Sequence, residues 1–359
     1  MFKLLKSFTL HLLTGANVAS ILVMLVVGYS DRINPVSHPV LANVGLAFPV
    51  ILAVNLAFLV LWLFLKPRMA FIPVVGLLVC YEPIRIYSPL NVPKTPPEGC
   101  VKVLSFNVWT WRDCDKPDET IDYIVRENAD IVCLQEAGVY GERRERILGR
   151  LDSLYPYREC SLRANNTEET MICSKFPIIR KKDIEFEPTL NSATAYYLLM
   201  GRDTVVVINN HLQSNCFSDQ EKEAFKTMVK GDMERDSASV ESKRLMEKLS
   251  STVLMRGPQA DAVAAFVRSC SGRSVILCGD FNDSPISYVR HTIARELVDC
   301  YVESGNGPGI SYHNSGFYVR IDNIMCSDDW VPYGCKVDSK VKSSDHYPIV
   351  CWLKKRQKP

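Results

Sequence analysis

Basic residues are not in excess in this chain, and charge of either sign is scarce in its first part. The 359 residues include 42 Lys and Arg against 40 Asp and Glu. The first 94 residues hold seven basic and two acidic residues, which leaves 35 basic and 38 acidic residues for the remainder. A domain that grips a long nucleic acid usually carries a basic surface. The composition disfavours a nucleic-acid partner without excluding one, because a bound cation supplies positive charge locally.

Cysteine metal motifs and internal repeats are also absent from the sequence. None of the thirteen cysteines belongs to a CxxC pair, so a zinc knuckle is not supported. Several cysteines lie inside apolar runs, among them Cys133, Cys278 and Cys351, where cysteine usually acts as a small buried hydrophobic residue. The lack of a repeat of about 20 to 50 residues excludes solenoid and propeller architectures.

Long uncharged segments fill the first part of the chain. The segment 41–65 has no charge and is long enough to cross a bilayer of about 30 Å at about 1.5 Å per residue. Segments 8–29 and 69–87 are predicted as further spans, the last being the weakest because it contains Pro73, Glu82 and Pro83. An interfacial helix is the alternative for the last one, and a cleaved signal peptide for the first. We predict a module of about three transmembrane helices over residues 1–87.

The charges that flank these segments predict their orientation. Lys3 and Lys6 precede the first span, and Lys66 and Arg68 follow the second. The positive-inside rule places both groups in the cytoplasm. Three spans then make a multi-pass protein with an extracytoplasmic C-terminal domain, whereas two spans leave that domain inside. The many cysteines favour the cytosol, so both placements stay open, with the extracytoplasmic one preferred.

The rest of the chain is predicted to be one large α/β (α+β) domain. Residues 88–99 contain four prolines and are predicted to form a semi-rigid spacer that holds the domain off a surface. Residues 100–355 alternate strand and helix patterns, with strands over 101–108, 130–134, 169–174, 196–199, 204–209, 274–278, 321–326 and 347–353. A long helical stretch over 219–267 is predicted to break at Gly257-Pro258. The predicted architecture is two face-to-face sheets with helices outside.

Six polar motifs each follow an apolar run, and they recur in order over the C-terminal domain. Each alone is a common string with an ordinary explanation, such as a turn residue, a surface charge, a helix N-cap or a structural histidine. Together they supply the carboxylates, amides and imidazoles that hold a hard divalent cation and a phosphate. The motifs are Ser105-Phe106-Asn107, Gln135-Glu136, Asn210-His211-Leu212, Gly279-Asp280-Phe281-Asn282, Arg320-Ile321-Asp322 and Ser344-Asp345-His346.

The chemistry that these side chains suit is phosphoester hydrolysis. Attack on a phosphoester requires positive charge near the developing oxyanion and a base for the attacking water. Mg²⁺ prefers one or two carboxylates and keeps several waters, so Glu136 with an amide oxygen of Asn107 fits it better than zinc.

The ordered motifs resemble those of the endonuclease/exonuclease/phosphatase superfamily, which includes deoxyribonuclease-I-like and exonuclease-III-like nucleases, inositol polyphosphate 5-phosphatases and neutral sphingomyelinases. The resemblance covers roughly residues 100–355. It implies a four-layer αββα sandwich and hydrolysis of phosphoesters with Mg²⁺ or Mn²⁺ as cofactor. It further implies that Glu136 and Asn107 bind the metal, that Asp345 adds a second carboxylate, and that Asp280 orients or deprotonates the attacking water.

The same resemblance implies a set of phosphate contacts. His211 and Asn282 would bind phosphate oxygens, and His346 would contact the phosphate while Asp322 fixes its ring. Arg256, which opens an apolar helix, is a further candidate phosphate contact by its chemistry alone. The family pattern leaves open which residue is the general base.

Two positions depart from the family pattern, and one segment is unusual. Asn323 stands where many nucleases have tyrosine, and the segment after Asn107 lacks the aspartate that some abasic-site endonucleases use. Trp109 and Trp111 in that segment could stack on a base or sugar, face lipid, or pack in the core. The segment 218–257 is highly charged and is predicted to be a solvated helical flap beside the substrate cleft.

The predicted function is a membrane-tethered, metal-dependent phosphoesterase that acts on a phosphodiester or phosphomonoester. Lipid-linked or small phosphoesters rank above nucleic acid because of the tether and the acidic balance of the domain. An extracytoplasmic endonuclease or exonuclease is the first alternative. A non-catalytic membrane receptor or scaffold that keeps the fold is the second, although no proposed site residue is visibly replaced. No protein partner is inferred.

Overall fold

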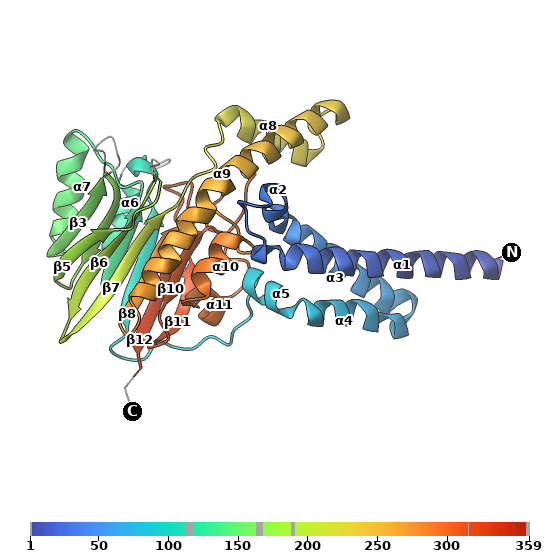
Figure 1. The fold of residues 1–359 in the computed structure, drawn as a ribbon, viewed down its shortest axis with the longest axis horizontal. Helices are drawn as coiled ribbons and strands as arrows, with labels where there is room; N and C mark the ends of the chain where they lie inside the picture. Colours follow the sequence, from blue (N-terminus) through green and yellow to red (C-terminus); the bar gives the residue numbers. More distant parts are fainter. Residues whose placement is uncertain (1, 113–117, 163–167, 188–190, 315, 357–359) are drawn as a thin grey trace.

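Two six-stranded sheets form the centre of the C-terminal domain (Figure 1). The computed structural model describes all residues except 1, 113–117, 163–167, 188–190, 315 and 357–359. The first sheet has the order β11 (Trp330–Val337), β12 (Ile349–Lys355), β1 (Val101–Asn107), β2 (Ile131–Gln135), β4 (Glu168–Ser174), β3 (Tyr157–Leu162). The second has the order β5 (Ile178–Asp183), β6 (Ser192–Met200), β7 (Asp203–His211), β8 (Ser274–Asp280), β10 (Asp322–Cys326), β9 (Val298–Asp299).

Helices cover the outer face of each sheet, so the domain has four layers. Those outside the sheets are α6 (Glu119–Glu127), α7 (Glu142–Asp152), α9 (Arg235–Ser269) and α10 (Tyr288–Ala294); α8 (Asp219–Lys230) and α11 (Cys300–Ser304) are peripheral. Ile124 of α6 packs in one buried cluster with Leu104 of β1. Val263 of α9 packs in another with Ile208 of β7. A third cluster fills the space between the sheets. The predicted αββα sandwich is confirmed.

Strand pairing brings the ends of the central strands to one edge of the sandwich. β1 and β2 are parallel, with Asn107 opposite Gln135. β7 and β8 are also parallel, with His211 opposite Asp280. Asp322 opens the antiparallel strand β10 directly opposite Asp280. Side chains from both sheets therefore meet at a common rim.

The helical flap of residues 218–257 and the helix that continues from it differ from the prediction at the expected break, Gly257-Pro258. Ser218 caps α8 through a capping box, and Gly231, with φ of 78°, ends it. The helix α9 then runs from Arg235 to Ser269 straight through Pro258, so the predicted interruption at Gly257-Pro258 is wrong. Buried residues on both sides of the proline hold the helix together, because packing against the second sheet outweighs the lost backbone hydrogen bond.

Several strands at the sheet edges were not predicted, and for β5 the reason is that its side chains are mostly exposed. β5 has the sequence Ile-Ile-Arg-Lys-Lys-Asp and lies at the edge of the second sheet. Its exposed charged residues interrupt the apolar run by which a buried strand is recognised. β3 and β11 are likewise edge strands of the first sheet. Polar edge strands are common because they discourage pairing with other chains.

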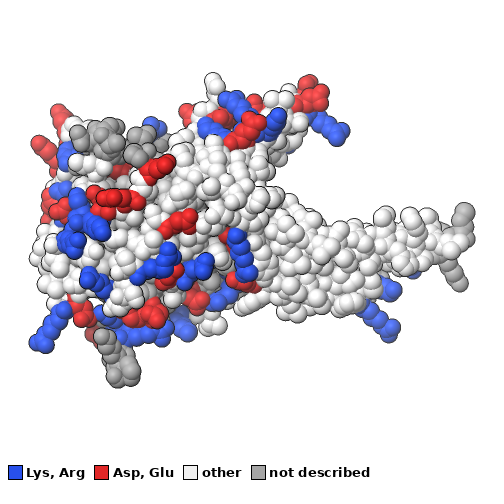
Figure 2. All heavy atoms as spheres, viewed as in Figure 1, with Lys and Arg blue, Asp and Glu red and all other residues white. Residues whose placement is uncertain are grey.

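The N-terminal part forms a helical arm that extends from the domain. Its elements are α1 (Phe2–Gly28), η1 (Ser30–Arg32), α2 (Pro39–Ala42), η2 (Val44–Ala47), α3 (Phe48–Leu65), η3 (Pro67–Ala70), α4 (Phe71–Val79) and α5 (Tyr81–Tyr87). Two helices are long and apolar enough to cross a membrane, and a third span results if the α4–α5 pair, bent by 67°, counts as one. Figure 2 shows the arm almost free of charged groups, whereas the domain carries both signs.

Polar residues inside the arm pair with one another. Trp62 of α3 donates from its indole nitrogen to Oδ1 of Asn17 at 3.0 Å, and Ser20 of α1 donates to Oδ1 of Asn55 at 3.1 Å. Such pairs bind helices together in an apolar surrounding. The polar residues of the first predicted span are therefore compatible with a helix that faces α3.

The arm is docked on the domain, and the proline-rich segment does not separate the two. Phe48 and Ile86 of the arm share a buried cluster with Ile286 of the domain. The Asn91 side chain donates to the carbonyls of Val302 and Gly305 at 3.0 and 2.6 Å. The extended segment therefore lies along the domain surface and does not separate the domain from the arm.

Candidate active site

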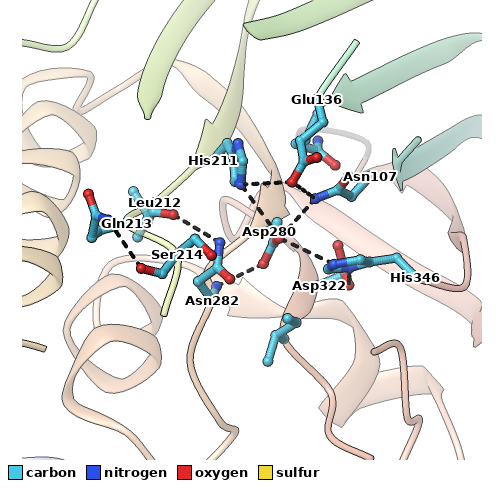
Figure 3. Close-up of polar contacts among 12 residues, drawn as sticks. Asn107, Glu136, His211, Leu212, Gln213, Ser214, Asp280, Asn282, Asp322 and His346 are labelled. Atoms are coloured by element: carbon cyan, nitrogen blue, oxygen red, sulfur yellow. Dashed lines mark hydrogen bonds and ion pairs between the residues drawn. The ribbon is translucent and has the colours of Figure 1, made fainter. Parts of the chain in front are cut away.

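The rim described above gathers side chains from both sheets (Figure 3). Asn107 ends β1, Glu136 follows β2, His211 ends β7 and Asp280 ends β8. The amide nitrogen of Asn107 donates to Oδ2 of Asp280 at 3.1 Å and to Oε1 of Glu136 at 3.3 Å. The second of these bonds joins two groups of the first sheet, and the first crosses to the second sheet. The Asn107 amide therefore links the two halves of the site.

Two histidines approach the same oxygen of Asp280. His346 Nδ1 hydrogen-bonds with Oδ2 of Asp322 at 2.8 Å, and its Nε2 lies 3.7 Å from Oδ2 of Asp280. His211 pairs through Nδ1 with the buried carboxylate of Glu169, and its Nε2 lies 3.8 Å from the same oxygen. Each imidazole is thus oriented by its own carboxylate.

Burial and charge shift the pKa values of these groups. Burial raises the pKa of the Asp280 carboxyl to about 6, and the imidazole of His346 opposes that rise. Burial alone would lower the pKa of His346, but the carboxylates of Asp322 and Asp280 raise it to about 10. At neutral pH, Asp280 is therefore mostly ionised and His346 is a cation.

Two residues of the rim have backbones in the left-handed region. Glu136 has φ of 49° and Asn282 has φ of 53°, and neither is a glycine. The backbone N–H of Asn282 donates to Oδ1 of Asp280 at 2.8 Å, and the side-chain nitrogen of Asn282 donates to the carbonyl of Leu212 at 2.9 Å. Such conformations persist where the surroundings enforce them, and they concentrate at functional sites.

The oxygen donors at the rim fit a hard divalent cation. The carboxylates of Glu136 and Asp280 face the same amide of Asn107, and within the described residues neither forms an ion pair with Lys or Arg. Asp345 lines the same cavity as these two carboxylates. Carboxylate oxygens are ligands that Mg²⁺ and Mn²⁺ prefer. Asn107 presents its side-chain nitrogen to these carboxylates, because its Oδ1 accepts from the backbone N–H of Trp109 at 3.1 Å, so coordination by Asn107 requires its side-chain amide to turn over.

A second combination of residues is also close enough to bind a metal. Ligand atoms of Asp280, Asp322 and His346 lie within 4.8 Å of one another. A metal on His346, however, would require a neutral imidazole, and the flanking carboxylates favour its protonated form. In this structure the three groups are also joined by the hydrogen bond between His346 Nδ1 and Asp322 Oδ2 at 2.8 Å.

A cavity of about 220 Å³ opens over the rim. Arg256 lines it, but its side chain is buried and donates to the carbonyl of Gln213 and to Oδ1 of Asn215, both at 2.9 Å. Its Nε lies 3.4 Å from Asp283. Arg256 therefore anchors the loop after β7 in this structure. A larger cavity, of about 870 Å³, lies between α5, α10 and β11 and contains none of the rim residues.

The two tryptophans after β1 differ in their surroundings. Trp111 is fully buried and its indole nitrogen donates to the carbonyl of Ala137 at 2.9 Å, so it belongs to the core. Trp109 lines the cavity, with the Arg112 guanidinium 4.6 Å from its ring centre.

The structure gathers eight of the nine predicted site residues at the rim, and Arg256 lies at its border. Two neighbours were missed, and the first is Glu169, which orients His211. Its only signal was a charged residue near the start of a buried strand, a position where a lone carboxylate needs a partner. Tyr312, whose ring centre lies 5.0 Å from that of His346, was also missed, because it follows no strand.

Comparison with known proteins identifies a family whose members match this part of the chain. The model of the Endonuclease/Exonuclease/phosphatase family matches residues 104–346. A model described as a domain of unknown function (DUF8431) matches residues 10–87. No curated protein matches the sequence significantly.

Solved structures with the same fold are distant in sequence. The endonuclease/exonuclease/phosphatase from Beutenbergia cavernae is 18% identical over 72% of each chain, with a TM-score of 0.51. The catalytic domain of human nocturnin, with bound sulfate, is 16% identical over 73% of this chain and 96% of its own, with a TM-score of 0.51. The 2′,3′-cyclic phosphatase ANGEL2, in complex with adenosine-2′,3′-vanadate, is 15% identical over 74% and 100%, with a TM-score of 0.50. At these identities the similarity establishes the fold.

Proposed function

Because the chain belongs to the endonuclease/exonuclease/phosphatase family, we propose that it is a membrane-tethered, divalent-cation-dependent phosphoester hydrolase. The observation that carries the proposal is the contact of Asn107 with both Glu136 and Asp280, which unites residues far apart in sequence. The phosphatase activity of the neighbour ANGEL2 and the sulfate bound to nocturnin support a site for a tetrahedral anion.

The proposed metal ligands are Glu136, Asn107 and Asp345, and the cofactor is Mg²⁺ or Mn²⁺. When bound, the ion supplies positive charge to the phosphoryl oxygens. The protein contributes by fixing the ligands: Glu136 is held in a left-handed backbone conformation, and Ser344 donates to the carbonyl of Asn107 at 2.8 Å. Rigid ligands select the geometry that a small hard cation requires.

The proposed base is Asp280. Its pKa of about 6 lies close to neutral pH, where a carboxylate is both ionised and basic enough to take a proton from water. The backbone N–H of Asn282 donates to Oδ1, the other carboxylate oxygen of Asp280, at 2.8 Å. This bond fixes the orientation of the carboxylate and so the direction of attack. Proton transfer to Asp280 is stabilised by the loss of repulsion with Asp322.

The proposed phosphate contacts are His346, His211 and Asn282. His346, kept cationic by Asp322, donates from Nε2 to an oxygen of the phosphoryl group. His211 is oriented in the same way by Glu169. As the negative charge on the phosphoryl oxygens grows during attack, these donors bind the transition state more tightly than the substrate.

The proposed localisation is a multi-pass membrane protein with its catalytic domain outside the cytoplasm. The N-terminus lies at the end of the arm that is remote from the domain (Figure 1), and Lys66 and Arg68 follow α3, whose other end contacts the domain. Positive charge at that remote end supports a cytoplasmic location for it.

Labelling of Cys216 tests this placement. It is the exposed cysteine among those the structure describes. A membrane-impermeant maleimide added to sealed, right-side-out vesicles is expected to modify Cys216, as located by mass spectrometry, and Cys216→Ala removes that modified peptide. Modification that requires permeabilised vesicles would instead place the domain in the cytoplasm.

Hydrolysis of bis-p-nitrophenyl phosphate by the full chain in detergent micelles tests the reaction. We expect release of p-nitrophenol with Mg²⁺ or Mn²⁺, its loss with a chelator, and a decrease of at least 100-fold in Glu136→Ala and in His346→Ala. Glu159→Ala, on exposed β3, serves as the control. A folded wild-type protein that is inert with either metal would favour the scaffold alternative, and preference for plasmid DNA or RNA over small esters would favour a nuclease.

A further inference from the structure

One wall of the catalytic cavity belongs to the membrane arm. Asn43 and Leu46 line the same cavity of about 220 Å³ as Asp280 and His346. Leu46 lies in η2, and α3 begins at Phe48. Two residues of 3₁₀-helix advance about 4 Å, so this wall stands at the point where an apolar, membrane-length helix begins.

The joint between the arm and the site is tight. A Cβ atom on Gly45 would lie 2.0 Å from the carbonyl oxygen of Ile286, in the loop that follows β8. Arg320, just before β10, is buried and donates to the carbonyls of Ile86 and Tyr87 at the end of α5. The arm therefore contacts the loops next to Asp280 and Asp322 directly, and it forms a fixed part of the cavity.

A further part of the cavity lining is aromatic, and it comes from the flap region and from the loop before β10. Phe217, Phe225 and Phe317 stack, with ring centres 5.3 Å apart for Phe217–Phe317 and 3.9 Å for Phe225–Phe317. Phe217 and Phe317 line the cavity, together with Leu249 of α9. Apolar side chains from three segments, Leu46 among them, therefore line the cavity together with the polar rim residues.

An apolar groove lies beside this opening, between α2 and α9. Its apolar lining consists of Val40 of α2 and of Met246 and Leu254 of α9, and Lys243 and Glu247 of α9 border it. Val40 is 53% exposed and Leu46 is 41% exposed, although both lie next to the start of α3. Exposed apolar residues at the base of membrane-length helices are expected to contact lipid.

The cavity lacks the features of a nucleic-acid groove. Among the described residues its cationic lining consists of Lys222, Arg256 and the catalytic-rim residue His346, and Arg256 is engaged by Gln213, Asn215 and Asp283. Binding of a polynucleotide depends on a row of basic residues along its backbone. A single phosphate with an apolar substituent suits these walls better.

We propose that the substrate is a membrane lipid with a phosphoester headgroup. Its phosphate lies over Asp280 and His346, and its hydrocarbon chain leaves between Leu46 and Phe317 toward the bilayer. The proposal rests on the phosphoesterase function proposed above and assigns a substrate class to that site. Access from the membrane explains why the arm is built into the cavity wall.

A homologous series of p-nitrophenyl alkyl phosphates tests the proposal without fixing the headgroup. The full chain in phosphatidylcholine nanodiscs is assayed with the methyl and the dodecyl ester, which share the reacting phosphodiester. We expect kcat/KM to be at least tenfold higher for the dodecyl ester. Leu46→Asp and Leu46→Gln should abolish that preference, measured in each variant as the ratio of kcat/KM for the dodecyl ester to kcat/KM for the methyl ester. Leu199→Asp, on β6 and outside the cavity, should keep it, because tail partitioning into the nanodisc is unchanged.

The outcomes separate the two proposals. Equal rates for both esters, or a dodecyl preference that survives in Leu46→Asp, would overturn the lipid assignment and leave the phosphoesterase intact. Absence of hydrolysis of either ester, with Glu136→Ala identical to wild type, would overturn the phosphoesterase. A dodecyl phosphate with a diazirine in its tail gives a readout that needs no turnover. Photolabelling of residues 43–48 or of Phe217 supports the lipid path, and labelling confined to the outer faces of α1 and α3 contradicts it.

Discussion

At the scale of single residues, the site is organised around one oxygen. The Nε2 atoms of His346 and His211 lie 3.7 and 3.8 Å from Oδ2 of Asp280. The other ring nitrogen of each imidazole hydrogen-bonds with a buried carboxylate, that of Asp322 for His346 and that of Glu169 for His211. Three carboxylates and two imidazoles therefore form one chain of contacts. Buried charges are tolerated in such a chain because each has a partner, and removal of one partner leaves another uncompensated.

Asp322→Asn tests the role of the carboxylate behind His346. Asparagine keeps an acceptor for the imidazole but removes the charge, so the raised pKa of His346, about 10, should fall. We expect kcat to drop about 100-fold and the alkaline limb of the pH–rate profile to move to lower pH. Asp152→Asn, at an exposed position, is the control. An unchanged alkaline limb would show that His346 does not act as a cation.

The pKa of Asp280 predicts how metal affinity depends on pH. In the metal-free protein this carboxyl has a pKa raised to about 6. A proton on Asp280 brings an additional positive charge beside the cation and competes with its binding. Mn²⁺ affinity, measured by calorimetry on the full chain, should be nearly constant above pH 7. It should fall by up to about tenfold per pH unit below 6. Equal affinities at pH 5 and pH 7 would show that the ion held by Glu136, Asn107 and Asp345 is not influenced by the charge of Asp280.

The site residues were predictable because they lie at the ends of apolar strands. A pattern of that kind locates Asn107, Glu136 and Asp280, since parallel strand ends share one edge of a sheet. It does not locate Glu169, whose partner comes from another sheet, nor the engagement of Arg256 by the loop after β7. Both contacts depend on which surfaces meet when the sheets pack against each other. The periodicity of apolar residues in a single sequence does not reveal those surfaces.

At the scale of elements, the flap is held by one buried acid. Glu221 completes the capping box of α8 and accepts from Lys248 of α9 at 2.6 Å. The hydrogen bond from Lys248 lowers its pKa to about 2. A lowered carboxyl pKa stabilises the folded flap above the unfolded value of about 4.5, and that stability is lost as the pH falls from there toward 2. The attachment of α8 to α9 is therefore complete at neutral pH.

Glu221→Gln should loosen the flap at neutral pH. The change removes the charge and weakens the cap, at a cost of about 1 kcal/mol, which corresponds to about fivefold more frequent opening. Limited proteolysis between α8 and α9 at pH 7 should therefore be about fivefold faster, while the thermal unfolding of the domain stays the same. Glu223→Gln, which alters an exposed ion pair with Lys226, should leave the cleavage rate as in wild type. Equal cleavage of the two variants would mean that another contact holds the flap.

Helices and strands were predicted best where the local pattern of apolar and capping residues determines the secondary structure. The buried strands and the start of α8 follow from apolar runs and from the capping box at Ser218. The course of α9 through Pro258 does not, because Gly257 lets Pro35 of the arm approach and the buried face of the helix spans the proline. Local helix-breaking propensity was outweighed there by contacts with segments far away in sequence.

At the scale of the whole molecule, the arm and the domain form one packed body. Phe48 and Ile86 bury themselves against Ile286, and Arg320 binds the end of α5. The composition predicts a membrane module and a catalytic domain, but the docking of one on the other depends on small residues at the contact. Glycine at position 45 is the clearest example, because its closest neighbour is a backbone atom that has no freedom to rotate away.

Gly45→Ala should therefore separate the two parts measurably. The added Cβ would lie 2.0 Å from the carbonyl oxygen of Ile286, so η2 must shift, at a cost of about 1–3 kcal/mol. We expect a lower thermal unfolding midpoint in micelles and a loss of the preference for the dodecyl ester, since Leu46 moves with η2. Gly149→Ala makes the same chemical change in exposed α7, where nothing lies within 4 Å, and should stabilise by up to about 1 kcal/mol. If Gly45→Ala unfolded at the wild-type temperature, the arm would have to be a loose tether, and a cavity wall built from it could not select the substrate.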